Sequence, residues 1–310
     1  MNFLNQTVGD KLKQPQLRPP DKVGIEIEME SDKPFPGGEE TEKKWRRDRD
    51  GSLRGRHSLE YILARPMQKK GAVHAISLLS RALEKAGTKI TGSVREGVHV
   101  HINVRDLTFR QLWTLVTCWY VIEDLVTETL CGEGRVGNHF CLRLSDADVG
   151  LQRVLSVVSG EEGLGALRDD LLRYSALNFV SLFRHGTLEF RAMRTPRDIN
   201  KIKDWAALLL ALKTNSKDYD NPASVVTYFS AGGERAFLEH LLGKNRADII
   251  INTAGDGWGS ELRKGARLAQ ELAFAVPDWH KETEEPETAI VPVVPIFVNI
   301  EAIHDALQDL

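Results

Sequence analysis

The chain has 310 residues, of which 42% are hydrophobic and 27% are charged, and its net charge of −3 gives no general attraction to nucleic acid. It has no run of 18 or more apolar residues and no signal-peptide pattern, so we expect a cytoplasmic globular protein without a membrane span. The three cysteines form no CxxC pair and are expected to be free thiols.

Patterning divides the chain into three parts. Residues 1–22 contain three prolines and little periodicity, which predicts an extended lead-in. Residues 23–276 carry both strand-like and helix-like patterns, which predicts a single α+β domain. Residues 277–310 turn acidic and then apolar with two prolines, which predicts a C-terminal extension. Such a tail either packs on its own domain or is lent to another subunit of a homo-oligomer.

Four segments alternate between apolar and ionisable residues, as strands with one polar face do. The first, Val23–Glu30, carries Glu26, Glu28 and Glu30 at every second position. The later segments are Ser58–Ala64 with Glu60, Gly97–Val104 with His99 and His101, and Thr187–Met193 with Glu189 and Arg191. A solvent-exposed edge strand explains any one of these patterns. Four such strands in one sheet would gather the ionisable groups on one surface.

Helical spacing predicts the layers that cover the sheet. Apolar residues recur three or four apart over Gln68–Ala86, where Gly87 is the expected stop. Apolar residues on most sides of Asp106–Leu130 predict a long, largely buried helix or helix pair that packs across the sheet. Further helices are expected over residues 151–172, Ile199–Lys213, Arg235–Leu242 and Glu261–Ala275. The glycine-rich segment Gly132–Gly137 is expected to be a surface loop, and Asn178–Phe183 and Thr187–Met193 a two-stranded hairpin.

The stretch Lys43–Arg56 concentrates basic residues around the turn signal Asp50-Gly51-Ser52. A solvated loop is the simpler interpretation, and an arm that grips phosphates is the other. Nucleic-acid binding is disfavoured because Trp45 is the one aromatic residue among these charges.

The carboxylates of the first strand point to divalent metal. Glu26 and Glu28 lie one strand repeat apart, about 6.6–6.8 Å, which suits carboxylates that serve two neighbouring ions. Crowded carboxylates repel each other unless a cation neutralises them. Oxygen-rich sites favour Mg²⁺ or Mn²⁺, whereas the pair His99 and His101 leaves a two-histidine zinc or iron centre as the rival.

Arg191 places a fixed cation beside this zone. Its guanidinium can hold phosphate or carboxylate oxygens in a two-pronged contact, or it can form an ion pair with Glu189 or Glu60. Metal ions and an arginine over an open sheet form an arrangement suited to phosphoryl transfer.

The same residues form four motifs in order. These are Gly24-Ile-Glu26-Ile-Glu28, Asp50-Gly-Ser52-Leu with Leu59-Glu60-Tyr-Ile, Gly97-Val-His99-Val-His101-Ile, and His185-Gly-Thr-Leu-Glu189-Phe-Arg191. Together they cover about residues 23–198 and resemble the signature of the amidoligase family, within the carboxylate–amine ligase superfamily of glutamine synthetase and glutamate–cysteine ligase.

The resemblance implies a curved, mostly antiparallel sheet backed by helices, with residues 23–276 as the catalytic domain. On it, ATP would phosphorylate a carboxylate of a small molecule or peptide, and an amine would displace the phosphate. By position, Glu28 and Glu60 would hold one Mg²⁺, and Glu26, His99 and Glu189 the Mg²⁺ that bridges the ATP phosphates. Mn²⁺ is the alternative metal.

The remaining matched positions receive less direct roles. Arg191 would stabilise the transferring phosphoryl group, and Asp50 matches an acidic position of the pattern. His101 is expected to contact substrate or cofactor rather than metal. Arg47, in the basic stretch, is expected to contact ATP. The runner-up is a metal-dependent phosphotransferase or hydrolase on the same sheet, and a third reading is a non-catalytic metal-binding protein.

Overall fold

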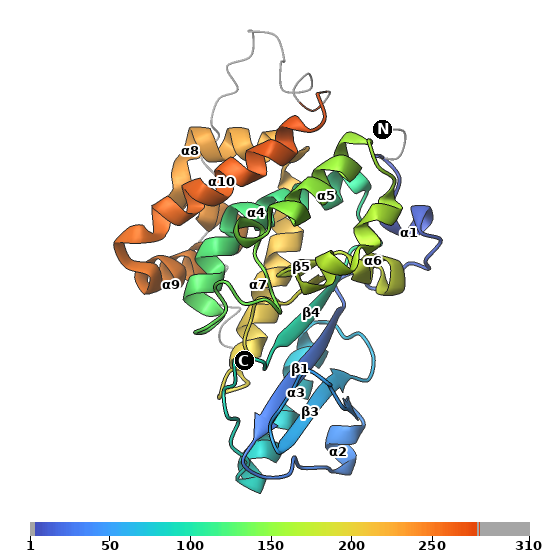
Figure 1. Ribbon diagram of the computed structural model, residues 1–310, viewed down its shortest axis with the longest axis vertical. Helices are drawn as coiled ribbons and strands as arrows, with labels where there is room; N and C mark the ends of the chain where they lie inside the picture. The colour runs from blue at the N-terminus through green and yellow to red at the C-terminus, as the bar shows by residue number, and fades with distance from the viewer. Residues whose placement is uncertain (1–3, 278, 280–310) are drawn as a thin grey trace, which may run out of the picture.

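The computed structural model describes residues 4–277 and 279, and it contains a six-stranded antiparallel sheet with helices around it (Figure 1). The strand order is β2-β3-β1-β4-β6-β5. The strands are β1 (Val23–Ser31), β2 (Trp45–Asp48), β3 (His57–Leu63), β4 (Val98–Asn103), β5 (Leu177–Asn178) and β6 (Thr187–Phe190). The predicted α+β fold, with an antiparallel sheet backed by helices, is confirmed.

The apolar face of the sheet is sealed by helices because the strands alternate as predicted. In β1, the side chains of Val23, Ile25 and Ile27 are buried in the core. Helix α3 (Lys69–Ala86) lies behind the sheet in Figure 1, and Trp45 Nε1 of β2 donates to the Ala75 carbonyl of this helix at 3.0 Å. One face is thereby closed, and the other is left for polar groups.

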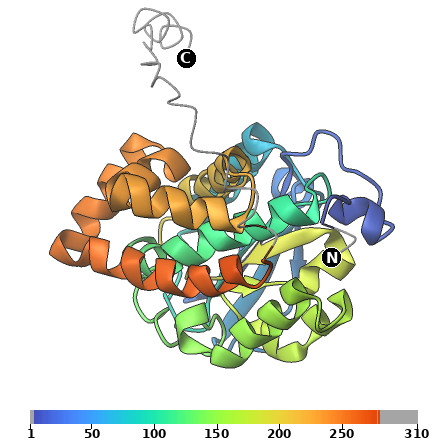
Figure 2. The same ribbon diagram turned by 90° about the horizontal axis from the view of Figure 1, so that it is seen from above.

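Helix α4 (Phe109–Leu130) is the centre of the second half of the molecule. Thr108 and Gln111 form a capping box at its start, and the helix is buried on nearly all sides. It packs against α8 (Pro222–Leu242) and α10 (Trp258–Phe274), which lie beside it in orange and red in Figure 2. The Trp119 ring meets that of Phe190 in β6 at 4.9 Å between centroids, so α4 also anchors the sheet.

Shorter elements complete the chain. The other α-helices are α1 (Val8–Lys11), α2 (Glu39–Glu42), α5 (Asp148–Ser159), α6 (Val180–His185), α7 (Lys201–Asn215) and α9 (Lys244–Ala254). The 3₁₀ turns are η1 (Leu144–Asp146), η2 (Leu164–Arg168), η3 (Asp170–Tyr174), η4 (Ser216–Asp218) and η5 (Gly255–Gly257). Among the described residues, no helix combines the length and apolar character that a membrane span requires.

Several predicted elements differ from the structure. The helix expected over residues 151–172 ends at Ser159 and is followed by the 3₁₀ turns η2 and η3. The helix expected over Arg235–Leu242 is the part of α8 after a kink at Gly233, and the part before the kink was not predicted; nor was α2. The expected strand Asn178–Phe183 is wrong beyond Asn178, because the Asn178 side chain accepts the amide of Val180 and starts α6, which ends at Gly186 with φ +60°. Strand β2 lies inside the stretch expected to be a basic loop. The lead-in includes α1, capped by Thr7, and α9 was not predicted.

Two other expectations concern the cysteines and the chain end. Cys118, Cys131 and Cys141 are all buried free thiols, as predicted. The predicted C-terminal extension lies outside the described residues from residue 280 onward, and the division into three parts stays a prediction.

Candidate functional site

The strand register brings the ionisable side chains together on the open face of the sheet. Directly opposed residues of antiparallel strands point to the same side. The opposed pairs are Glu28 with Glu60, Glu26 with His99, and His101 with Glu189. Side chains from four strands that lie apart in sequence therefore form one surface. We call it the acidic face and define it as these six residues together with Arg191.

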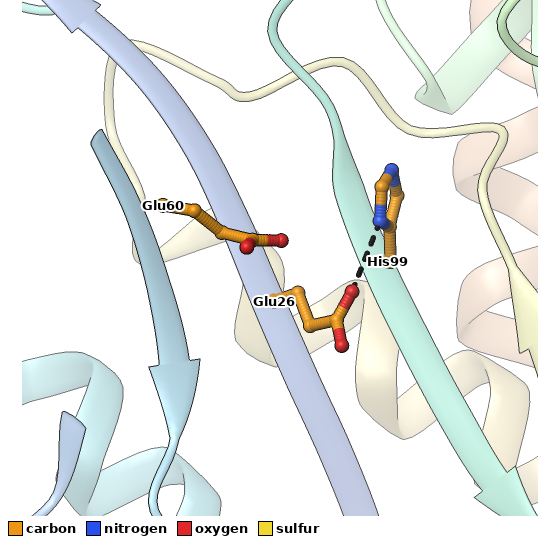
Figure 3. Close-up of side chains that lie close together, drawn as sticks. All are labelled: Glu26, Glu60 and His99. Atoms are coloured by element: carbon orange, nitrogen blue, oxygen red, sulfur yellow. Dashed lines mark hydrogen bonds and ion pairs between the residues drawn. The ribbon is translucent and has the colours of Figure 1, made fainter. Parts of the chain in front are cut away.

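Glu26 lies at the centre of the acidic face. One carboxylate oxygen is 3.3 Å from His99 Nδ1, and the other is 3.5 Å from His101 Nε2 (Figure 3 shows the first contact). Two groups of potential ligand atoms share this residue, Glu26 with Glu60 and His99, and Glu26 with His101 and Glu189. Within each group the ligand atoms lie within 4.8 Å of one another.

The donor set fits hard divalent cations. Each group has two carboxylates and one imidazole, which is a set that Mg²⁺ or Mn²⁺ accepts when phosphate and water oxygens fill the other positions. His101 Nε2 is buried, and 3.5 Å to Glu26 is too long for a good hydrogen bond, so it has no hydrogen-bond partner among the described residues. A nitrogen left in this state is available to a ligand.

Glu189 is held rigidly from both sides. Arg191 donates to one of its oxygens at 2.5 Å, and Asn178 Nδ2 donates to the other at 2.7 Å. The Ser181 hydroxyl donates to that second oxygen as well. The Glu189–Arg191 ion pair, one of the two predicted uses of Arg191, is therefore present, and the same guanidinium approaches His99 Nδ1 at 3.3 Å.

Charge is unevenly balanced across the face. Burial favours the protonated form of Glu26 and Glu189, but contacts with His99 and His101, and with Arg191 for Glu189, outweigh it. These contacts hold the pKa of Glu26 far below its usual range and lower the pKa of Glu189 to about 2.

At the opposite end of the face the balance is reversed. Burial raises the pKa of Glu28, and burial together with the neighbouring carboxylates raises the pKa of Glu60 to about 8. The Glu28–Glu60 end thus lacks positive charge that a cation would supply.

Gly97 makes room for the ligands. A Cβ at this position would lie 2.8 Å from Glu28 Oε2 and 3.2 Å from His99 Nε2. The glycine of the third motif is therefore explained by space beside the acidic face and not by a special backbone conformation. The Thr195 hydroxyl lies 2.7 Å from the Glu28 carbonyl and 3.0 Å from the Gly97 carbonyl, and so holds these two backbone segments together.

The two other predicted residues, Asp50 and Arg47, differ in their distance from the acidic face. Asp50 lies near enough that its charge raises the pKa of both Glu28 and Glu60. Arg47 is not brought to the acidic face, because it opposes Tyr61 on the other side of the sheet and pairs with Glu42 at 2.9 Å. Its predicted contact with ATP has no support in its position.

Several residues of the site carry no sequence signal that we recognised. Asn178 and Ser181 fix Glu189, and Thr187 Oγ1 lies 3.1 Å from His101 Nδ1. Arg135, in the predicted surface loop, is 2% exposed and contacts the backbone beneath the site. Thr187 lies two residues before Glu189 on the same strand, so strand periodicity alone could have found it.

A cavity of about 190 Å³ continues from the acidic face toward the N-terminal end of β1. It is lined by Glu26 and His101 together with Lys22, Pro66 and His185. A larger hollow of about 910 Å³ lies between α5 and α10, but it is open and contains none of the residues of the acidic face. The smaller cavity is therefore the one connected to the candidate chemistry.

Comparison with known proteins agrees with the third and fourth motifs, and the first two motifs lie outside the matched residues. The model of a family described as "putative amidoligase enzyme" matches residues 63–213, which include β4, α4 and β6. The description names an enzyme that forms amide bonds. No curated protein matches the chain.

Proposed function

We propose an ATP- and Mg²⁺-dependent carboxylate–amine ligase, on the premise that residues 63–213 match the model of the family described as putative amidoligase enzyme. The reaction would activate a carboxylate as an acyl phosphate, and attack by an amine would then form an amide or isopeptide bond. This proposal names the cofactors and the intermediate, which the family description does not.

The observation that carries the proposal is the sharing of Glu26 by two ligand groups. Two ions that share a carboxylate lie close together, as in sites that hold both oxygens of a displacement at phosphorus. Bound Mg²⁺ and ATP would supply the electrophilic phosphoryl group and neutralise its charge. Each group holds two carboxylates and one imidazole, and so has more oxygen ligands than the two-histidine, one-carboxylate set typical of zinc and non-haem iron centres.

The residues of the chain then take distinct tasks. Glu26, Glu60 and His99 would hold one ion, and Glu26, His101 and Glu189 the other. This grouping assigns His101 to metal, whereas the sequence analysis expected it to contact substrate or cofactor. It includes no atom of Glu28, which the sequence analysis expected to share a Mg²⁺ with Glu60.

Arg191 would act on the transferring phosphoryl group. Its guanidinium lies between Glu189 and His99, beside both ligand groups, where it could stabilise the charge on phosphorus. The cavity that begins at His101 would take one of the two substrates.

The direct test is trapping of the activated carboxylate. Purified protein is incubated with Mg²⁺, ATP, hydroxylamine and pools of carboxylic acids and peptides, because hydroxylamine converts acyl phosphates to hydroxamates. We expect hydroxamate and ADP in equal amounts with one class of carboxylate. ADP release without hydroxamate would instead indicate the phosphotransferase or hydrolase, and no ADP with any pool would contradict the proposal.

A further inference from the structure

Arg135 is a buried arginine without a carboxylate partner. Its side chain is 2% exposed, and among the described residues no Asp or Glu lies within ion-pair distance of it. Burying an unpaired guanidinium is costly unless all its donors are satisfied. Arg135 lies in the segment that was expected to be a surface loop, so its burial needs a separate explanation.

The guanidinium donates hydrogen bonds to main-chain carbonyls of two segments, residues 191–192 and Glu96, which meet beneath the acidic face. Nε donates to the Ala192 carbonyl at 2.7 Å, and Nη2 donates to the Arg191 carbonyl at 2.6 Å. Nη1 donates to the Glu96 carbonyl at 3.4 Å. A charged donor makes stronger hydrogen bonds than a neutral one, and the planar fork fixes the direction of all three.

These contacts lie where the regular ladder between β4 and β6 ends. The last opposed pair in the described ladder is Val100 with Phe190, and the chain then leaves strand geometry at Arg191. Beyond it, Val98 N bonds to the Met193 carbonyl at 2.9 Å, and Arg194 N bonds to the Cys131 carbonyl at 2.8 Å. Arg135 fills the gap between these two points and so substitutes for strand pairing.

We propose that Arg135 is a positioning residue for Arg191. It holds the backbone of residues 191–192 against that of Glu96, and this aims the Arg191 guanidinium at the space beside Glu189 and His99. The positioning itself follows from the three hydrogen bonds, whereas its value for catalysis rests on the proposed function.

The loop that carries Arg135 is built to deliver it. Gly132 and Gly134 have φ values of +88° and +74°, which bring the chain back toward the sheet directly after α4. Asn138 Nδ2 donates to the carbonyls of Val94 and Gly134, and so ties the loop to the segment that leads into β4. The loop is thus fixed on both sides of Arg135.

The test compares Arg135→Lys with Arg143→Lys. Both replace a buried arginine and keep its charge, but Arg143 serves carboxylates between α4 and η1 rather than the sheet. Hydrogen exchange is measured on the Val98, Arg191 and Arg194 amides, which pair across the gap or beside it. We expect faster exchange at all three amides in Arg135→Lys and wild-type exchange in Arg143→Lys. Wild-type exchange in both variants would overturn the proposal.

The link to catalysis has its own readout, the binding of Mg²⁺·ADP with aluminium fluoride as a mimic of the transferring phosphoryl group. We expect Arg135→Lys to weaken this binding on the order of 10- to 100-fold and to leave Mg²⁺·ATP binding within about twofold. In the Arg191→Ala background it should have no further effect, and additive losses would overturn the proposal. If wild-type protein binds no nucleotide, the proposed function fails while hydrogen exchange still decides the positioning role.

Discussion

Two buried clusters of charge in this molecule differ in how they are balanced. In the cluster between α4, η1 and α10, which we call the helical ion cluster, Arg143 lies 3.0 Å from Asp124 and 2.9 Å from Asp146. Lys264 adds a contact to Asp124 at 3.0 Å, and Glu128 lies 3.4 Å from Arg143. Every carboxylate named here has a basic partner within the protein. The neighbouring Glu123 instead accepts hydrogen bonds from Trp119 Nε1 and the Leu144 amide, and burial raises its pKa to about 8.

The acidic face lacks such closure. Arg191 neutralises Glu189, but Glu28 and Glu60 have no arginine or lysine within ion-pair distance among the described residues, and both have a raised pKa. The comparison teaches that burial of charge alone does not identify a site. A cluster that remains short of counter-charge is the better candidate, because a ligand must supply what the fold omits.

The largest effect is expected for Glu26→Gln. Since both ligand groups share this residue, the change should weaken Mg²⁺ binding by more than the roughly 100-fold that loss of an outer partner costs, and turnover should disappear. Calorimetric titration with Mg²⁺ or Mn²⁺ measures the affinity. Asp124→Asn in the helical ion cluster is the control, and it should leave metal affinity unchanged.

The reciprocal change is Arg143→Ala. It leaves Asp124 buried with Lys264 as its remaining counter-charge, so we expect the free energy of unfolding to fall by about 3 kcal/mol, at the low end for a broken buried pair because Asp146 and Glu128 are exposed. Urea denaturation gives this value. Metal affinity of the folded protein should not change, and a large loss of affinity would mean that the two clusters are coupled.

Arg191→Ala separates rate from binding. Removal of a donor that stabilises transition-state charge should raise the activation free energy by about 2 to 4 kcal/mol and lower the rate constant accordingly. Steady-state kinetics with the carboxylate found by trapping would measure this. A variant whose single defect was weaker ATP binding would reassign Arg191 to the ground state.

Gly97→Ala tests how tightly the ligands are packed. The new Cβ would displace the ends of the Glu28 and His99 side chains and not the backbone, so metal affinity should fall on the order of 10-fold. The free energy of unfolding should change by less than about 1 kcal/mol. Gly163→Ala has open space around its Cβ and serves as the control in the same two measurements.

The last expected effect is a pH dependence of stability without metal. Glu60 holds its proton more tightly in the folded protein, with a pKa of about 8 against the usual 4.5. The folded state therefore binds more protons between these two values, and stability falls as the pH rises through this window. Thermal unfolding in chelator from pH 5 to 8 should show this decline, and Glu60→Gln should flatten it.

Most of the acidic face could be predicted because strand periodicity is a local property of the sequence. Alternation in β1, β3, β4 and β6 places Glu26, Glu60, His99 and Glu189 on one side without knowledge of the tertiary fold. The order of strands and the choice of opposed pairs come from long-range packing, so the two ligand groups that share Glu26 emerged only from the register.

Other features were hidden for identifiable reasons. Arg135 lies in a glycine-rich segment, which is typical of surface loops, and its burial depends on carbonyls more than 50 residues away along the chain. Strand β2 was obscured because three of its four residues are charged and exposed at the sheet edge. Composition favoured a loop at both places, and tertiary contacts decided otherwise.

Calorimetry of ATP binding to the wild type and to Glu26→Gln, each with and without Mg²⁺, is the most direct test, because both ligand groups share Glu26. The account predicts binding that requires Mg²⁺ and is lost in the variant, while thermal unfolding shows that the variant stays folded. ATP binding that is independent of Mg²⁺, or that survives Glu26→Gln unchanged, would contradict a metal-dependent nucleotide site on the acidic face.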